Sequence, residues 1–234
     1  TKPSLGGFSS VAKKVPPIWK TLEEDGKKVV LLSIPGSTPP ELEKGITIRG
    51  RWGGWGADTY KVVYEPEEKL EERKSAGRGF RLFFLGAPLT KFVEKNNANS
   101  WKNNVQSFSV AKEAKLESHG LVVYAYIYDS TNDQKVNYDG IVFSLDKENV
   151  IADLKQGECS EWAPVQLKSK DTTFDSDIKI KVIKMWDNSN FRITILYNNL
   201  NRLITDPASV SDELTANVGP MVDFADNWPA QLLF

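Results

Sequence analysis

The residues best suited to contact a ligand form a glycine- and tryptophan-rich run, Arg51–Gly56 (RWGGWG). Glycines let a backbone approach a ligand closely, and the rings of Trp52 and Trp55 can stack on a sugar or a base. The run is not a phosphate-binding loop, because it lacks both the Gly-Lys-Ser/Thr ending and the GxGxxG spacing. We predict that Arg51, Trp52 and Trp55 face a substrate. The alternative is a glycine turn whose tryptophans cover the edge of a core.

A second polar run, Asp129–Asp133 (DSTND), resembles the start of a calcium-binding loop. Such a loop needs glycine at its sixth position and glutamate at its twelfth. Here those positions hold Gln134 and Gly140. The pattern therefore favours a polar turn over a calcium site.

Histidine and cysteine are too scarce for most catalytic and metal chemistry. His119 is the only histidine and Cys159 the only cysteine, so the chain can form neither a three-histidine zinc site nor an internal disulfide. We expect His119 to lie at a turn where a strand begins. No GxSxG elbow is present. We therefore assign no catalytic residue and no metal ligand within this chain.

The composition is that of a soluble globular protein, with 234 residues, 40% hydrophobic and 26% charged. A net charge of -1 indicates no general preference for nucleic acid or an anionic membrane. No apolar run approaches the ~20 residues that span a bilayer, and the N-terminal residues show no signal-peptide pattern. The compartment stays open.

The first elements expected along the chain are a helix and a strand. Pro16-Pro17 suits a helix start and Gly26 suits its C-terminal cap. The run Lys27–Ile34 is almost continuously apolar, which is typical of a parallel strand buried on both faces. No second helix–strand unit of this quality follows, so we expect the neighbours of this strand to come from sequence outside this chain.

The rest of the chain predicts mainly antiparallel β-structure, so the expected fold class is α+β. A charged helix is expected over 66–74, and Asp206-Pro207 is expected to cap and open a helix running to about Ala216. Two hairpins are expected, 121–128 with 138–145 and 178–186 with 191–197. Further strands are expected over Ile46–Arg49, Tyr60–Tyr64 and Phe80–Leu85.

Several stretches resemble one family. Gly7–Val30, followed by Ile34–Ser37, resembles the type I phosphodiesterase/nucleotide pyrophosphatase family of the alkaline phosphatase superfamily. Weaker similarity to the same family extends over Tyr128–Phe143, Ile193–Leu200 and Asn217–Met221.

The resemblance implies a doubly wound α/β core with two divalent metals, usually zinc, and a threonine or serine nucleophile. The family's nucleophile and its metal motifs do not occur in this sequence, so they would lie outside it. Residues 1–37 would then be a piece of the core, 38–216 a β-rich insert or cap that shapes substrate access, and 217–234 a return toward the core. The implied partners are the remainder of the parent chain and a phosphate-ester or nucleotide substrate.

Two other functions fit the sequence. A β-sandwich could hold a carbohydrate on Trp52, Trp55 and Trp101, which predicts flat, exposed tryptophan rings on one face. An insert that only mediates oligomerisation predicts an apolar surface patch and a stable dimer.

Overall fold

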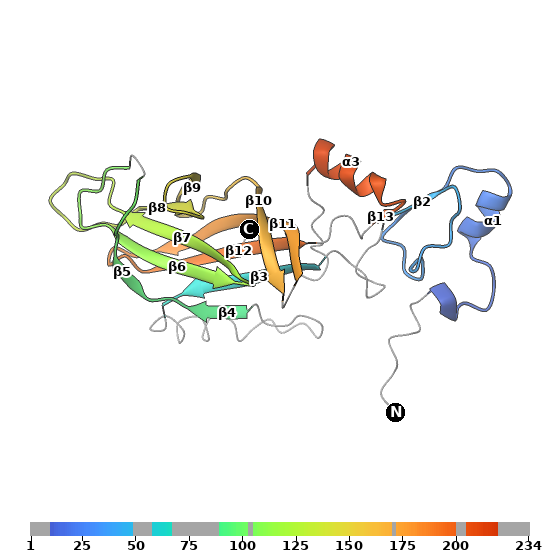
Figure 1. Ribbon diagram of the computed structural model, residues 1–234, viewed down its shortest axis with the longest axis horizontal. Coiled ribbons are helices and arrows are strands. Elements are labelled where there is room, and N and C mark those ends of the chain that lie inside the picture. Colours follow the sequence, from blue (N-terminus) through green and yellow to red (C-terminus); the bar gives the residue numbers. More distant parts are fainter. Residues whose placement is uncertain are drawn as a thin grey trace, which may run out of the picture. The chain divides into compact units, whose positions relative to one another are not determined.

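The computed structural model describes residues 10–48, 58–66, 89–102, 105–169, 172–199 and 205–219. They belong to two compact units (Figure 1). Unit 1 consists of Thr1–Thr59 and Asn198–Ala225, and unit 2 of Tyr60–Tyr197 with Asp226–Phe234. Each unit has its own hydrophobic cluster. The segments expected from the sequence (1–37, 38–216 and 217–234) are drawn from the family resemblance, whereas these units are defined by contacts within each unit. The expected segments stay a prediction.

Unit 1 combines short helices with a small mixed sheet of strand order β1-β2-β13. Its described elements are a 3-10 turn at Ser10–Ala12, α1 (Ile18–Glu24), β1 (Val30–Leu32), β2 (Ile46–Ile48), β13 (Thr205–Asp206) and α3 (Ser209–Asn217).

Helix α1 lies where the prolines and the glycine predict it. Pro17 is its N-cap, and Gly26 just beyond its end has a φ of 75°, a conformation that glycine adopts without strain. The Glu23 carboxylate in the last turn of α1 accepts hydrogen bonds from the backbone N–H groups of Lys44 and Gly45, both at 2.8 Å. The Glu43 N–H donates to the same carboxylate at 3.0 Å and contributes most to holding the pKa of Glu23 below its ordinary value, with the Lys44 and Gly45 bonds acting in the same direction. The three bonds attach the loop before β2 to the helix.

Strand β1 confirms the parallel pairing but not the burial expected of it. β1 and β2 run parallel, with Val30 opposite Ile46. One neighbour of β1 thus comes from this chain, whereas the sequence predicts that its neighbours lie outside it. Only Leu31 is buried, at 8% exposure, whereas Val30 and Leu32 are 62% and 61% exposed. The expected burial on both faces is therefore wrong for this chain, because within the described residues nothing covers the second face of β1.

The start of the C-terminal helix also differs from the prediction. Asp206 lies in β13, opposite Thr47, and α3 begins at Ser209 with Ala208 as its N-cap. No side chain caps the helix. The Asp-Pro pair ends a strand here instead of opening the helix, because Asp206 pairs with β2.

Unit 2 contains two five-stranded sheets. One has the order β10-β11-β12-β3-β4 and the other the order β5-β6-β7-β8-β9. The strands are β3 (Asp58–Glu65), β4 (Leu89–Phe92), β5 (Lys95–Asn97), β6 (Lys112–Ser118), β7 (Leu121–Tyr128), β8 (Gly140–Ser144), β9 (Val150–Lys155), β10 (Ala163–Ser169), β11 (Thr172–Met185) and β12 (Phe191–Asn199).

Hairpins build the sheet that contains β7, as the alternating sequence predicts. β7 alternates buried and half-buried side chains along most of its length and pairs antiparallel with both β6 and β8. Its turn from β6 is the pair His119-Gly120, with φ of 50° and 70°. Two consecutive residues at positive φ match the right-handed twist of a tight hairpin. His119 thus lies at the turn where the sequence predicts it.

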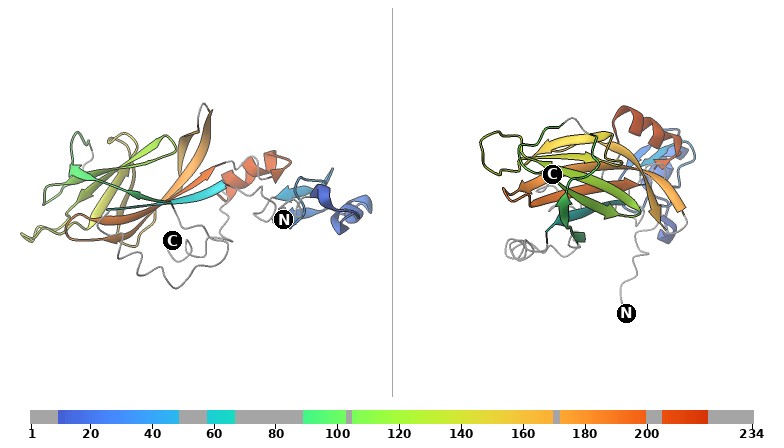
Figure 2. Two further views of the ribbon diagram at one scale, coloured as in Figure 1. Left: turned by 90° about the horizontal axis from the view of Figure 1, so that it is seen from below. Right: turned by 60° about the vertical axis from the view of Figure 1, so that its left-hand side comes forward.

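The two sheets of unit 2 pack face to face around one core (Figure 2). Its fully buried members come from both sheets: Leu116, Val123, Ile127, Ile141 and Phe143 from one, and Val62, Leu167, Ile178, Ile180, Ile193 and Ile195 from the other. The Tyr64 and Tyr197 hydroxyls hydrogen-bond to each other at 2.8 Å inside this core, and burial raises the pKa of Tyr64 to about 12. The mainly antiparallel β-architecture is therefore confirmed, with β3–β4 as a parallel pair.

The charged helix expected over 66–74 and the strand expected over Phe80–Leu85 fall on 67–88 apart from residue 66, and 67–88 lies outside the described residues. In the part of the chain that is described, no helix is both long and apolar enough to cross a bilayer.

Candidate functional site

The substrate-facing residues predicted from the sequence, Arg51, Trp52 and Trp55, lie outside the described residues. Trp101 is described, and it is not the flat, exposed ring that a sugar platform needs. Its ring centroid lies 5.2 Å from that of Tyr126 at an interplanar angle of 53°. Its Nε1–H donates to Glu113 Oε2 at 2.7 Å. Trp101 therefore belongs to a packed cluster on the outward face of the β7 sheet.

That outward cluster satisfies its own members. The ammonium of Lys147 lies 2.7 Å from Glu113 Oε2 and 5.1 Å above the ring of Tyr124. Burial would raise the pKa of Glu113, but hydrogen bonds from Lys147, Trp101 and the Asn99 N–H outweigh it and hold this pKa below its ordinary value. The arrangement stabilises the sheet and leaves little of its polar surface for a ligand.

A more open site lies at the end of the β7–β8 hairpin, and Asp129 organises it. Asp129 is fully buried directly after β7. Its carboxylate accepts hydrogen bonds from Ser109 Oγ at 2.5 Å, from the Thr131 N–H at 3.1 Å and Oγ1 at 3.0 Å, and from the Asn137 N–H at 3.2 Å. Its own N–H donates to Ser107 Oγ at 3.1 Å. One carboxylate thus joins both ends of the hairpin loop to the segment that precedes β6.

These donors decide the charge of Asp129 and what it can bind. Burial would raise the pKa of Asp129, but the hydrogen bonds from Ser109, Thr131 and Asn137 outweigh it and hold the pKa below its ordinary value. The carboxylate is therefore ionised, and protein donors already occupy its oxygens. This geometry agrees with the sequence prediction of a polar turn rather than a calcium loop.

Further hydrogen bonds shape the loop between residues 129 and 139. Ser130 donates its N–H and its Oγ–H to the Asp139 carboxylate, at 2.8 and 2.6 Å. Tyr138 donates its hydroxyl to the Val110 carbonyl at 2.7 Å, and the Phe108 N–H donates to the Asp129 carbonyl at 2.9 Å. The loop and the 105–111 segment are consequently held at a set spacing.

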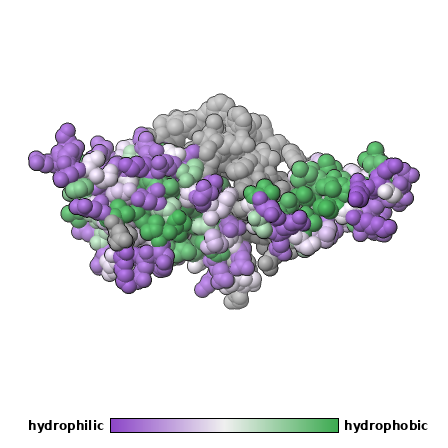
Figure 3. Space-filling view, turned by 90° about the horizontal axis from the view of Figure 1, so that it is seen from above, coloured by the Kyte–Doolittle hydropathy of each residue, from purple (hydrophilic) through white to green (hydrophobic). Residues whose placement is uncertain are grey.

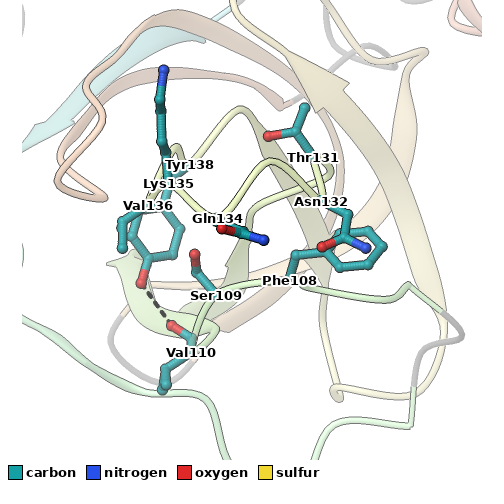
Figure 4. Close-up of a pocket in the computed structure, with 9 residues that line it drawn as sticks. All are labelled: Phe108, Ser109, Val110, Thr131, Asn132, Gln134, Lys135, Val136 and Tyr138. Atoms are coloured by element: carbon teal, nitrogen blue, oxygen red, sulfur yellow. Dashed lines mark hydrogen bonds between the residues drawn. The ribbon is translucent and has the colours of Figure 1, made fainter.

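Between these two segments lies a pocket of about 430 Å³ (Figure 4). This volume falls within the range of small-molecule sites. One wall consists of the consecutive residues 108–110 and the other of the hairpin loop. The pocket is lined by Phe108, Ser109, Val110, Thr131, Asn132, Gln134, Lys135, Val136 and Tyr138.

Two carboxamides in this pocket were not identified from the sequence as candidate ligand contacts. Asn132 and Gln134 are both exposed, and Gln134 has a φ of 64°. A glutamine in this left-handed region is uncommon. A signal was present in the sequence, since the position where a calcium loop needs glycine holds a large amide side chain instead. What the sequence could not indicate is the facing wall, which comes from a distant segment.

Other chemistry-bearing residues do not gather into a site. Cys159 is exposed, and His119 Nδ1 lies 2.8 Å from Ser118 Oγ in the hairpin turn. Among the residues that the structure describes, no three His, Cys, Asp or Glu side chains lie where they could together hold a metal ion.

Comparison with known proteins leaves the family open. No family model matches this sequence, and neither a curated protein nor a solved structure is detectably similar to it. The resemblance to the phosphodiesterase family therefore stays a prediction.

Proposed function

We propose that this chain is a non-catalytic part of a metal-dependent phosphodiesterase or nucleotide pyrophosphatase. In this proposal unit 1 joins an α/β core supplied by other sequence, and unit 2 is a β-rich cap that shapes substrate access. The two divalent metals, usually zinc in such enzymes, and the nucleophile would be held by that other sequence. The assignment to this family is based on the sequence resemblance alone. The structural observations below support two other parts of the proposal, the incomplete core and the inserted cap.

The uncovered strand β1 carries the proposal. β1 pairs with β2 in parallel, and it forms one edge of its sheet in the described part of the chain. Parallel strands normally lie in sheets covered on both faces by helices. Val30 and Leu32, at 62% and 61% exposure, project from a face that no described helix covers. A further strand beside β1 and a helix over it would complete an ordinary α/β sheet.

Other apolar side chains of unit 1 support the same interpretation. Val15 and Ile18 are 73% and 72% exposed, and Leu22 is 40% exposed. Among the described residues of unit 1, the buried cluster consists of Val29, Leu31 and Leu42, with Trp19 packed against it. Figure 3 shows hydrophobic surface open on unit 1, at the right of the view. So much exposed apolar surface around so small a core is typical of a surface that another segment covers.

The topology of unit 2 supports an inserted domain. The continuous main segment of unit 2 begins at Tyr60 in β3 and ends at Tyr197 in β12. These two strands are neighbours in the sheet, and the Tyr64 and Tyr197 hydroxyls are in contact. A domain whose two ends lie close together can be inserted into another domain without disrupting it.

A charge placed on the uncovered face tests the proposal. We expect Val30→Lys to leave the thermal unfolding of this chain nearly unchanged, because Val30 already contacts solvent. In the longer protein encoded by the surrounding reading frame, we expect the same substitution to lower the melting temperature and the zinc-dependent hydrolysis of bis(4-nitrophenyl) phosphate. Val150→Lys is the matched control, since Val150 is a half-exposed strand residue in unit 2, at 50% exposure.

The remaining outcomes separate the alternatives. This chain alone should not accelerate the hydrolysis beyond zinc or manganese alone, and robust turnover would show that it holds a catalytic site of its own. A dimer that Val30→Lys dissociates would favour the oligomerisation module instead. A longer protein with no phosphodiesterase activity under any divalent metal would refute the enzyme class but leave the incomplete sheet of unit 1 in place.

A further inference from the structure

We propose that the pocket at the β7–β8 loop of unit 2 binds a neutral sugar ring. This inference does not depend on the proposed phosphodiesterase function. It rests on three properties of the pocket: exposed apolar side chains, two carboxamides with no side-chain hydrogen bond in the described part of the chain, and no carboxylate among the described lining residues.

Exposed apolar side chains from both walls of the pocket are unusual for a surface loop. Phe108, Val110 and Val136 are 45%, 66% and 61% exposed, and all three line the pocket. Elsewhere in unit 2 the large apolar side chains mostly lie in the core. The Phe108 ring offers a flat surface to the C–H face of a pyranose. Val110 and Val136 add apolar contact on the other side of the pocket (Figure 4). Such a surface gives contact area to a sugar ring but does not fix the orientation of the ring.

The two carboxamides would provide the orientation. Each carries two N–H donors and one carbonyl acceptor, which matches the paired donors and acceptors of neighbouring sugar hydroxyls. Neither Asn132 nor Gln134 has a side-chain hydrogen bond within the described part of the chain. Figure 4 shows the Gln134 carboxamide in the middle of the pocket, opposite the wall formed by residues 108–110. The backbone of Gln134 has a φ of 64°. This conformation is strained for glutamine but not for glycine, so it lowers the stability of the loop.

The charges around the pocket favour a neutral ligand. The Asp129 carboxylate beneath it is already bonded by Ser109 and Thr131, so it is not available to a cation. Of the lining residues that the structure describes, Lys135 alone has a formal charge, and its side chain extends away from the other labelled residues in Figure 4. The exposed Asp133 lies between the two carboxamides in the chain, but it does not line the pocket, and its Oδ1 accepts the Lys135 N–H at 2.9 Å. Among the described residues no group of three carboxylates could hold a metal ion here, and the described lining offers a phosphate no cluster of cations.

Titration of the ¹⁵N-labelled chain with simple glycosides tests this site. The probes are the methyl glycosides of glucose, galactose and mannose, each followed through the side-chain NH₂ signals of Asn132 and Gln134. We expect at least one glycoside to shift these signals saturably, with a dissociation constant on the order of 1 mM for so small a ligand. Uridine and inorganic phosphate are the comparison probes. Saturable shifts with either of these, and none with any glycoside, would overturn the assignment to a sugar.

The variant Gln134→Gly separates a binding role from a structural one. Glycine adopts a φ of 64° without strain, so the melting temperature should stay the same or rise. The affinity for the glycoside should fall about tenfold, because a hydrogen-bonding group is lost. Ser100→Gly is the matched control, since Ser100 is exposed, lies outside the pocket and has a φ of 60°. It should gain stability in the same way and bind normally. Wild-type affinity in Gln134→Gly would overturn the proposal.

Discussion

Unit 2 buries its apolar side chains, whereas unit 1 leaves many of its own in solvent. In unit 2, Ile127 and Ile180 are fully buried between two complete sheets. In unit 1, Val30 and Leu32 are more than half exposed beside a three-strand sheet. The difference shows that regular strands do not by themselves make a finished core. A sheet also needs a second layer, which unit 2 contains and the described part of unit 1 does not.

The largest expected effect concerns the buried ion pair of unit 2. Glu65 is fully buried, and its Oε2 accepts a hydrogen bond from Arg192 Nε at 2.6 Å. Glu65→Leu would leave the guanidinium without this carboxylate, so we expect the free energy of unfolding to fall by about 3–5 kcal/mol. Urea denaturation of the chain measures it.

Two controls make that prediction specific. The double variant Glu65→Leu/Arg192→Met should recover most of the loss, because no buried charge is left unpaired. Glu148→Gln breaks an ion pair with Lys102 in which both side chains are at least half exposed, and should cost less than about 1 kcal/mol. Equal losses at Glu65 and Glu148 would contradict the contrast between buried and exposed pairs.

A pair of core truncations compares the two units directly. Ile127→Ala should lower the stability of unit 2 by about 2–5 kcal/mol, because it leaves a cavity in a closed core. Leu31→Ala removes a side chain from the small cluster of unit 1, so it should speed amide exchange there and leave unit 2 unchanged. Hydrogen exchange followed by mass spectrometry on peptides from each unit measures both. If either substitution changed amide exchange in both units, the two units would not be independent.

A close contact in the sheet of β7 gives the next effect. A Cβ built on Gly140 would lie 2.2 Å from Cζ of Tyr128, which is its cross-strand neighbour. Gly140→Ala should therefore displace the Tyr128 ring, break its 2.8 Å hydrogen bond to Asp153 and cost about 1–3 kcal/mol. Thermal unfolding measures the loss.

The double variant Gly140→Ala/Tyr128→Leu serves as its control. The shorter side chain removes the steric clash, so adding Gly140→Ala to Tyr128→Leu should cost much less than adding it to the wild type. An unchanged cost would place the strain elsewhere in the hairpin.

The smallest effect comes from an acid-sensitive contact on the outward face. The pKa of Glu113 is lowered in the folded state, so the stability it contributes is present above its ordinary value of 4.5 and is lost as the pH falls through the folded value. Glu113→Gln should cost about 0.2–1 kcal/mol at pH 7 and make stability between pH 7 and 3 less dependent on pH. Glu117→Gln, four residues along the same strand and exposed, is the control and should leave the pH profile unchanged.

Much of the fold follows from local patterns in the sequence. The alternation in Leu121–Tyr128 predicts β7, and the return at 138–145 predicts β8. The prolines and glycine around Ile18–Glu24 predict α1. These predictions succeed because burial on one face of a strand or helix imposes a period on the sequence. The expected helix start at Asp206 fails because a strand partner, which is not local, takes that residue.

The candidate pocket could be predicted only in part. The polar run from Asp129 indicates a loop, and the hairpin indicates where it begins and ends. The wall formed by Phe108, Ser109 and Val110 comes from the other side of β6, and no local pattern connects it with the loop. Hydrogen bonds of Asp129 and the bond from the Tyr138 hydroxyl to the Val110 carbonyl bring the two segments together.

By itself the sequence determined the class of fold, most strand positions and the scarcity of metal-binding residues, because these depend on residue type and short-range periodicity. The tertiary structure decided which faces are covered. It showed that β1 has an open apolar face and that Asp129 is bonded on all sides by protein donors, and it placed two carboxamides opposite an exposed phenylalanine. Each of these depends on contacts between residues far apart in the chain, and local sequence does not encode their distances.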